Sequence, residues 1–515
     1  MNVWCDDVIG YRSDIRAITK ELKKDSLGLK NRLQSILYDA QYVLLSTNIF
    51  NDIPLVANER CGLWYIPKPM LTDTCYFKST DGHTHHWKFS FRRLNLHLLS
   101  LFSNHTTIAL VDSTRKGKIM PDALLKTLPI WCSVINSILF EDVSDQYLAK
   151  EMGLKEDVDV SFLLNLKENK WLLVPEEVIS ANEANEIRKK IDSFVAEVHR
   201  LQLFDKEYLI QKLGSLRPIV PQWLYPSKTR SKDAVIDNSV GPILTVLCIT
   251  ASAKVTNEDS RITVRYTEEG RISSTSWVYV QGSGDDHELW ATKRLCDGDF
   301  TPNFFWNHIY NRGNKTNPSF INNHTGLIHD WITDGELITR INAEYNDAKF
   351  LLATSSDLDI SYIRNASHDT NIAIGTIESN LNYASFIESN SEFQQVVIFS
   401  DKFEVQNIPK RSIKILRYEI DSSKKGAKQL RMALPQILPH ICIENRILIM
   451  CESGKDISVG LALVLLCKNF DLEWSKVGLS VINKDVVRRH LSQIGDIRKV
   501  NPSRNTLQSV NSFLM

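Results

Sequence analysis

The segment at residues 446–466, RILIMCESGKDISVGLALVLL, constrains the fold more than any other stretch of the chain. Its short apolar run is typical of a buried strand, and the longer apolar run after the polar loop is typical of a buried helix. Strands and helices that alternate in this way pack as a sheet covered by helices. The segment therefore predicts an α/β domain near the C-terminus.

The same alternation recurs along the chain. QVVIF at residues 395–399 and IKILRYEI at residues 413–420 have the composition of strands, and residues 424–441 have a helical pattern. In the N-terminal half, TIALVD at residues 107–112 predicts a strand followed by a charged loop and a helix. GPILTVLCITASA at residues 241–253 predicts another buried strand. This order favours an α/β fold with parallel strands.

The chain of 515 residues is long enough for several domains. We predict a large N-terminal α/β domain at residues 1–310 and a C-terminal parallel-sheet domain at residues 386–515. Residues 311–385 begin with a stretch rich in Asn, Asp, Ser and Thr, and they are predicted to connect the two.

The composition says more about the cellular compartment of the protein than about whether it binds RNA. Lys+Arg and Asp+Glu both number 61, so the formal net charge is zero and RNA binding is neither supported nor excluded. The nine scattered cysteines include no CxxC pair, which favours reduced thiols. No apolar run reaches the roughly 18 residues of a membrane helix, and the N-terminus lacks a signal-peptide pattern. We expect a cytoplasmic protein, or alternatively a nuclear one, without a membrane partner.

The loop after the strand at residues 447–451 has the features of an anion site. Backbone N–H groups at a strand-to-helix turn converge on an anion, and the helix dipole reinforces them. The segment resembles the phosphate loop of cysteine phosphatases, in which five residues separate a cysteine from an arginine, but Ile457 stands at the arginine position. The loop residues concerned are Cys451, Glu452, Ser453, Gly454, Lys455, Asp456 and Ser458.

Three interpretations of this loop stay open. It could be an active phosphatase site, a buried turn that binds nothing, or a loop that holds phosphate without hydrolysing it. Ile457 cannot supply the bidentate guanidinium that phosphate transfer needs. Asp456 adds a negative charge that an incoming phosphate would feel. These residues favour the third interpretation.

A second candidate anion site follows the strand at residues 107–112. The loop offers hydroxyl groups and cations, so it could contact phosphate, although a solvated basic turn is the alternative. Its residues are Asp112, Ser113, Thr114, Arg115, Lys116, Gly117 and Lys118.

The segment KSTDGHTHHW at residues 78–87 has a turn signal at Asp81-Gly82 and predicts a hairpin. Lys78 and Ser79 at this turn are candidates for substrate contact. A plain hairpin with satisfied histidines is the alternative, and a zinc site has no partner pair at ligand spacing.

Acidic residues follow a predicted strand in QGSGDDHELWA, at residues 281–291. Adjacent carboxylates at Asp285 and Asp286 could hold Mg²⁺, and His287 could act as a general base. The alternative is that Asp286 caps the helix that follows. Both interpretations stay open.

Five long motifs together resemble one family. They are CYFKSTDGHTHHWKFSFRRLNLHL, VDSTRKGKIMPDALLKTLPIWC, QGSGDDHELWA, CESGKDISVG and NPSRNTLQSVNSFL. This set is similar to the initiator tRNA phosphoribosyl-transferases, the tRNA A64-2′-O-ribosylphosphate transferase family. The resemblance implies transfer of a 5-phosphoribosyl group from phosphoribosyl pyrophosphate to the 2′-OH of adenosine 64 in the T-stem of initiator tRNA. That mark keeps the tRNA out of elongation.

The resemblance also implies Mg²⁺ with the pyrophosphate donor, a C-terminal domain like dual-specificity phosphatases, and no DNA partner. A cysteine-dependent phosphatase and a non-catalytic tRNA-binding protein are the alternatives. RNA would meet dispersed basic residues, because A-form helices are recognised by shape and phosphate contacts. In addition to the loop at Arg115–Lys118, the candidates are Arg92, Arg93, Lys424, Lys425, Lys428, Arg431, Arg488, Arg489, Arg498 and Arg504.

Overall fold

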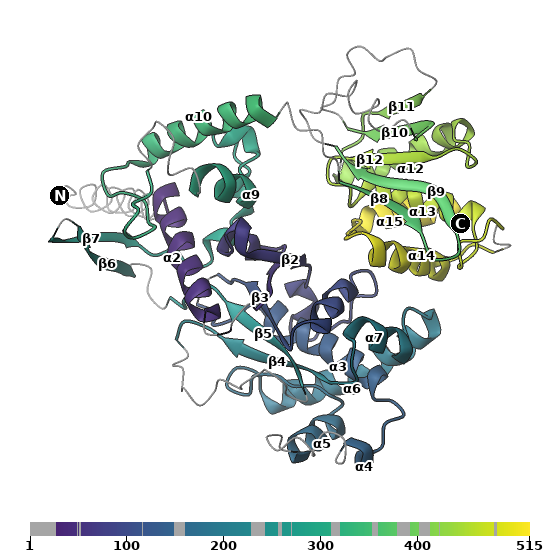
Figure 1. The fold of residues 1–515 in the computed structure, drawn as a ribbon, viewed down its shortest axis with the longest axis horizontal. Helices are drawn as coiled ribbons and strands as arrows, with labels where there is room; N and C mark the ends of the chain where they lie inside the picture. Colours follow the sequence, from purple (N-terminus) through teal and green to yellow (C-terminus); the bar gives the residue numbers. More distant parts are fainter. Residues whose placement is uncertain are drawn as a thin grey trace, which may run out of the picture. The chain divides into compact units, whose positions relative to one another are not determined.

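The computed structural model describes most of the chain in two compact units (Figure 1). Unit 1 comprises Met1–Phe89, Leu101–Ile191 and Ile210–Ala348, and unit 2 comprises Ser90–Ser100, Asp192–Leu209 and Lys349–Met515. The last division lies inside the segment 311–385 that the sequence predicts as a connection. The described residues are 27–48, 50, 53–115, 117–148, 160–227, 243–255, 260–268, 270–310, 320–352, 359–377, 392–400, 413–421, 423–477 and 481–515.

Unit 1 is built on a five-stranded parallel sheet in the order β2-β1-β3-β5-β4. Every residue of β1, β3 and β5 is buried, as expected for parallel strands covered on both faces. The predicted α/β fold and the strands predicted near residues 110 and 247 are confirmed. The strands are β1 (Leu55–Asn58), β2 (Leu71–Cys75), β3 (Thr107–Asp112), β4 (Ile219–Leu224) and β5 (Leu244–Thr250).

The strand order of unit 1 explains where a site can form. β1 lies between β2 and β3, so the chain first moves to one side of β1 and then continues on the other side. In open parallel sheets, ligands bind at such a reversal, outside the carboxyl ends of the strands. The residues that follow β1, β3 and β5 meet at this edge.

Helix α2 (Leu29–Thr47) packs against the sheet through a buried stripe that includes Leu33 and Leu37. The first residue of α10, Asp334, accepts hydrogen bonds from the N–H groups of Leu29 (3.0 Å) and Lys30 (2.8 Å). These bonds satisfy donors that the first turn of a helix leaves open. The other α-helices up to residue 352 are α3 (Leu128–Leu139), α4 (Asp145–Tyr147), α5 (Val160–Glu168), α6 (Ala181–Leu201), α7 (Lys206–Leu213), α8 (His287–Trp290), α9 (Pro302–Phe304) and α10 (Asp334–Leu352).

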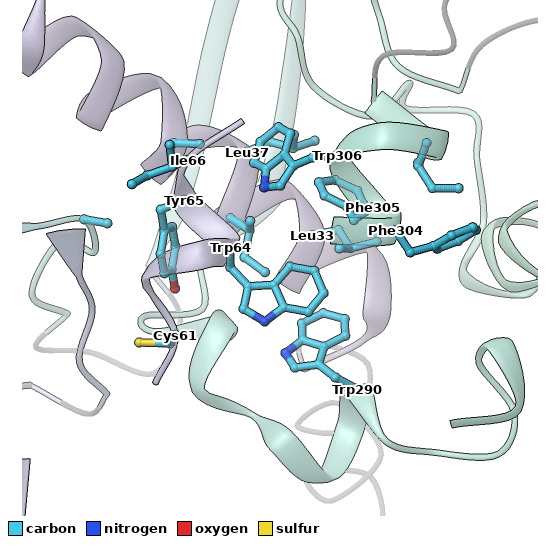
Figure 2. Close-up of a cluster of buried hydrophobic side chains, with 14 of the residues drawn as sticks. Leu33, Leu37, Cys61, Trp64, Tyr65, Ile66, Trp290, Phe304, Phe305 and Trp306 are labelled. Atoms are coloured by element: carbon cyan, nitrogen blue, oxygen red, sulfur yellow. The ribbon is translucent and has the colours of Figure 1, made fainter. Parts of the chain in front are cut away.

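An aromatic cluster anchors two turns that border the site (Figure 2). Trp64 packs against Trp290 and Phe305, with ring centroids 4.6 and 6.0 Å apart. The indole N–H of Trp290 donates to the carbonyl of Ser283 at 3.0 Å. Aromatic rings bury large apolar areas in fixed geometry. The cluster therefore holds the turn after β1 against the turn that begins near Gly282.

Two further features complete unit 1. Strands β6 (Arg261–Glu268) and β7 (Arg271–Val278) form a two-stranded antiparallel ribbon. The hairpin predicted around Asp81-Gly82 is wrong, because residues Ser79–Gly82 form a 3-10 turn and residues 83–93 contain no strand. A Cβ at Gly82 would lie 2.6 Å from the carbonyl oxygen of Asp122. The turn thus packs against the segment before α3 instead of pairing with a neighbouring strand.

Unit 2 has its own five-stranded sheet in the order β11-β10-β12-β9-β8. The edge strand β8 is antiparallel and the other four strands are parallel. The strands predicted at residues 395–399 and 413–420 are confirmed as β10 and β11. The strands are β8 (Ile360–Arg364), β9 (Asp369–Thr376), β10 (Gln395–Phe399), β11 (Lys414–Tyr418) and β12 (Ile447–Cys451).

Helix α13 (Ile457–Asn469) follows β12 directly and is buried from Ile457 to Cys467. The opening segment of the sequence is therefore the strand, turn and buried helix that its pattern predicts. Helices α12 (Lys424–Ile437), α14 (Lys484–Ile497) and α15 (Arg504–Leu514) complete the unit. In the described parts of the chain, no helix has the length and apolarity to cross a membrane.

Candidate active site

Asp112, the last residue of β3, is the buried centre of the candidate site. Its side chain is 0% exposed and pairs with Arg60 at 3.2 Å. The carboxylate also accepts from the amide of Asn58 (2.8 Å) and the thiol of Cys61 (2.9 Å). The backbone N–H of Ser113 adds a further bond of 2.8 Å. A buried carboxylate needs such donors because water cannot reach it.

Arg60 connects this buried carboxylate with a second one. Its guanidinium pairs with one oxygen of Asp285 at 2.8 Å, and Arg115 pairs with the other oxygen at 3.1 Å. Burial opposes the charge of Arg60, but the neighbouring thiol and carboxyl groups outweigh it and raise the pKa of the guanidinium. The structure thus joins two loops that the sequence predicts as separate sites.

The two loops pack directly on each other. Gln281 accepts from the N–H of Gly117 (2.9 Å) and donates to the carbonyl of Lys118 (2.8 Å). Gly282 has a φ of 66°, and a Cβ there would lie 2.3 Å from the carbonyl oxygen of Thr114. Glycine alone avoids both the strained backbone and this clash.

Strand β5 contributes a third segment through Ser252. The hydroxyls of Ser113 and Ser252 lie 2.8 Å apart, and Ser252 donates to the carbonyl of Thr114 at 3.0 Å. Both serine side chains are fully buried. These bonds fix the first residues of the loop, so Arg115 is the first one with an exposed side chain.

Asp286 turns away from Asp285. Its carboxylate accepts from the N–H of Leu289 (3.2 Å), which caps α8, and it pairs with Arg32 (2.8 Å). Among the described residues, no group of three His, Cys, Asp or Glu side chains is placed to hold a metal ion. The two aspartates do not converge on one point, so they do not fit a resident Mg²⁺. His287 lies 3.5 Å from Asp285 and is 67% exposed, which leaves its ring open to a substrate.

Other predicted donor-site residues lie around this edge. Lys118 is 56% exposed and pairs with Asp122 at 2.9 Å. Lys78 is half-buried, and the buried hydroxyl of Ser79 has no hydrogen-bond partner among the described residues. Lys116 lies outside the described residues.

A buried polar network lies beneath the loops. Tyr279 donates to Asp39 (2.7 Å) and accepts from the N–H of Ala253 (2.8 Å). Tyr65 accepts from the N–H of Gly284 at 3.0 Å. Burial raises the pKa of Asp39 well above its usual value and outweighs the hydrogen bond from Tyr279, which lowers it. The network ties α2 to the ends of β5 and β7.

The phosphatase-like loop of unit 2 uses part of its hydrogen-bonding capacity internally. Cys451 is buried, with its sulfur 3.1 Å from the hydroxyl of Ser458. Gly454 donates its N–H to the carbonyl of Cys451 (3.1 Å), and Lys455 donates its N–H to the hydroxyl of Ser453 (3.2 Å). These two N–H groups are not directed at a bound anion in this arrangement.

Arg498 is built into the structure of this loop. It donates to the carbonyl of Gly454 (3.0 Å), the carboxylate of Asp359 (2.7 Å) and the hydroxyl of Thr376 (2.8 Å). Its side chain is 5% exposed, so it is not available to RNA. Ile457, at the position of the phosphatase arginine, is buried in the core.

The negative charge of Asp456 is also directed away from an incoming phosphate, contrary to the expectation from sequence. Its carboxylate accepts from the N–H of Ser503 (2.9 Å) and the hydroxyl of Thr506 (2.5 Å). Asp456 therefore holds the start of α15 against the loop. Glu452 at the other end of the loop is half-buried.

The predicted RNA-binding residues differ in their surroundings. Lys424 and Lys425 are exposed in the first turn of α12, and Arg504 is exposed at the start of α15. Within unit 2, Arg93 donates to Asn501, and Arg488 pairs with Asp485 (3.3 Å). Lys428 and Arg431, also on α12, are exposed, and Arg92 and Arg489 are half-buried.

Sequence reasoning missed Asn58 at the end of β1 and Arg60 just after it, Arg32 on α2, and Ser252 after β5. A signal for the first pair was present. PLVANERC at residues 54–61 is a short apolar run that ends in polar residues, as the segment at 107–115 does. Arg32 carries no such signal, because its contact with Asp286 depends on how α2 packs.

Comparisons with known proteins cover nearly the whole chain. A family model described as the Rit1 N-terminal domain matches residues 22–329, and one described as the Rit1 DUSP-like domain matches residues 414–514. The tRNA A64-2′-O-ribosylphosphate transferase of Saccharomyces cerevisiae is 35% identical over 97% of this chain and 94% of its own length. An uncharacterized protein of Schizosaccharomyces pombe is 31% identical over 94% of each chain.

Solved structures match part of the chain. The Yvh1 phosphatase domain from Chaetomium thermophilum is 17% identical, with a TM-score of 0.23, and the match covers 30% of this chain and 95% of that one. PTPMT1 is 12% identical, with a TM-score of 0.20, and covers 30% and 93%. The family models and the curated relative carry the assignment: this chain belongs to the tRNA A64-2′-O-ribosylphosphate transferase (Rit1) family.

Proposed function

We propose that this chain transfers a ribosylphosphate group to the 2′-oxygen of adenosine 64 of a tRNA, the activity for which its S. cerevisiae relative is named. The structural observation that supports the proposal is Asp285, held between Arg60 and Arg115 where β1 and β3 end. Such a cluster offers cations for phosphate groups and carboxylates for the sugar.

We further propose phosphoribosyl pyrophosphate as the donor. Guanidinium groups bind phosphate oxygens in a bidentate manner, and Arg115 is 45% exposed. Without a donor, Arg115 is neutralised by Asp285. A bound phosphate replaces that contact, so the donor gains a cation and leaves one oxygen of Asp285 open to the reacting sugar, while the other oxygen stays paired with Arg60.

The reaction breaks the bond from the anomeric carbon to pyrophosphate and forms a bond from that carbon to the 2′-oxygen. As pyrophosphate leaves, positive charge develops on the ribose, as in other glycosyl transfers. The freed oxygen of Asp285 stabilises that charge. His287, 3.5 Å from Asp285, takes the proton of the 2′-hydroxyl.

Mg²⁺ belongs to this proposal as a companion of the donor's pyrophosphate. Asp285 and Asp286 face different arginines, so their carboxylates are not proposed as ligands of a resident ion. Initiator tRNA is the proposed acceptor, and the added phosphate would keep that tRNA out of elongation.

The test is transfer of label from ribose-labelled donor to initiator tRNA and to elongator methionine tRNA. We expect label on the initiator tRNA, lost when the target 2′-hydroxyl is replaced by hydrogen. Asp285→Asn should lower kcat at least tenfold, while Lys476→Gln, at a pair in unit 2, serves as the control. No label with either tRNA at any enzyme concentration would reject the proposal.

A further inference from the structure

The β6–β7 ribbon of unit 1 has two faces of different character. Ile262 and Val264 point inward and pack against the core, and Trp277 is only 3% exposed. The side chains on the other face alternate with these, as strand geometry requires. We call that side the outer face of the ribbon. It is formed by Arg261, Thr263, Arg265 and Thr267 of β6 and by Ile272, Ser274, Ser276 and Val278 of β7.

The outer face carries positive charge and hydroxyl groups without a carboxylate. Arg261 and Arg265 are exposed, and neither forms an ion pair with any of the described residues. Opposite Arg265 the partner strand places Ser274, and Thr263 is bonded to Ser276 at 3.1 Å. Two arginines in this setting can bind external anions without first breaking an internal pair.

The spacing of the arginines indicates an extended anion. Four residues of a strand separate them by about 13 Å, at roughly 3.3 Å per residue. At this backbone spacing the two guanidinium groups can each contact a different phosphate of one chain. Serine and threonine hydroxyls are common contacts to nucleic-acid phosphates and sugars. Two exposed arginines and a row of hydroxyl groups along one face therefore suit a chain of phosphates and sugars.

The ribbon is continuous with the candidate active site. β7 ends at Val278, and the next residues include Tyr279 and Gln281, which hold the site loops. The entry to β6 lies beside the same segment, because Tyr279 donates its N–H to the carbonyl of Ser260 (2.8 Å). Val255 also donates to Gln281, at 3.1 Å. An RNA helix held by the ribbon is thus held by the segments that shape the site.

We propose that the outer face of the β6–β7 ribbon is a docking surface for the phosphate backbone of the acceptor tRNA. The inference rests on the proposed function, which supplies the RNA. An A-form helix suits this face, because proteins recognise such helices by shape, phosphate and 2′-hydroxyl contacts. The ribbon therefore does not need side chains that recognise individual bases.

The test is the double variant R261Q/R265Q, measured by fluorescence anisotropy with labelled tRNA over a range of salt concentrations. We expect tRNA affinity to fall about tenfold and the slope of log affinity against log salt to fall by between one and two. The KM for tRNA should rise, while kcat at saturating tRNA and calorimetric donor affinity stay unchanged. R261K/R265K should restore most of the affinity.

The control is K293Q/R294Q, which removes two exposed charges from unit 1 outside the ribbon. It should leave tRNA affinity within about twofold. Equal losses in both double variants would show general charge attraction and overturn the proposal, as would wild-type affinity and salt slope in R261Q/R265Q. A wild-type protein that binds tRNA through the ribbon but transfers no label would reject the proposed function alone.

Discussion

The parallel strands of each unit lead into a loop that the sequence predicts as an anion site, but the two sheet edges use arginine differently. At the edge of the first sheet, Arg60 and Arg115 share Asp285, and Arg115 remains 45% exposed. At the edge of the second sheet, Arg498 is 5% exposed and its donors are directed at the protein. The edge of the first sheet thus carries an accessible arginine, whereas Arg498, which comes from the end of α14, is a structural clamp at the edge of the second.

This difference supports placing the proposed chemistry at the first sheet. An arginine that is itself half exposed, as Arg115 is, can exchange its carboxylate partner for phosphate, because both contacts are charge-assisted. An arginine buried among carbonyl, hydroxyl and carboxylate groups cannot leave without exposing unpaired polar atoms. The phosphatase-like turn has Ile457 at the arginine position, and the nearby Arg498 serves the fold.

The largest effect is expected for Arg60→Ala. Removing the guanidinium leaves Asp112 buried without its counter-ion, at a cost on the order of 3–5 kcal/mol in unfolding free energy. Transfer should fall at least 100-fold. Chemical denaturation and single-turnover transfer measure the two losses, with Arg60→Lys as the variant that retains charge. Full stability in Arg60→Ala would contradict the pairing with Asp112.

Arg498→Ala should destabilise unit 2 by about 3 kcal/mol, because the buried guanidinium is lost and the carbonyl of Gly454 and the hydroxyl of Thr376 lose their donor. Donor affinity of the folded protein should stay at the wild-type value. Chemical denaturation measures the loss of stability, and calorimetry measures the affinity for the donor. If donor affinity instead fell while stability held, the second sheet would carry the donor site and the comparison would be reversed.

Arg115→Ala should lower transfer about 10- to 100-fold, equivalent to roughly 1.4–2.7 kcal/mol, with little change in stability because the side chain is half exposed. Its affinity for tRNA should change less than its rate of transfer. Initial rates measure transfer, and fluorescence anisotropy measures the affinity for tRNA. Equal loss of both would move Arg115 from the donor site to the RNA surface.

Asp39→Asn tests the network beneath the first site. The pKa of Asp39 is raised by burial, whereas an unfolded aspartate titrates near 3.9. Above that value the unfolded chain releases a proton that the folded chain keeps, so wild-type stability falls as pH rises. The variant should lose this dependence. Melting temperatures of both proteins between pH 4 and pH 8 would reveal it, and parallel curves would contradict a protonated Asp39.

The smallest effect is expected for Cys451→Ser. The thiol faces Ser458 and no arginine is directed at an anion beside it among the described residues, so transfer should stay within about twofold. A chromogenic phosphate ester provides the second readout, and neither protein should hydrolyse it. Hydrolysis by the wild type that disappears in Cys451→Ser would restore the phosphatase interpretation.

The local sequence pattern predicted the loops after Asp112 and Cys451, because the end of a strand in a turn is specified by residues close together in the sequence. The run before Asp112 and the run before Cys451 are each buried strands in the structure. The hairpin predicted at Asp81-Gly82 failed, because packing of Gly82 against Asp122 decides that turn. A turn signal specifies a bend and says little about what the flanking residues pair with.

The sequence by itself determined the alternation of strands and helices, the position of the anion-type loops and the missing phosphatase arginine at Ile457. Only the tertiary structure decided that Asp285 meets Arg60 and Arg115, and that Arg498 faces inward. Strands and turns follow from the residues within a few positions of one another. The partner of a charged side chain depends instead on the spatial order of the strands in the folded sheet. That arrangement places residues 60, 112 and 285 at one edge of the sheet.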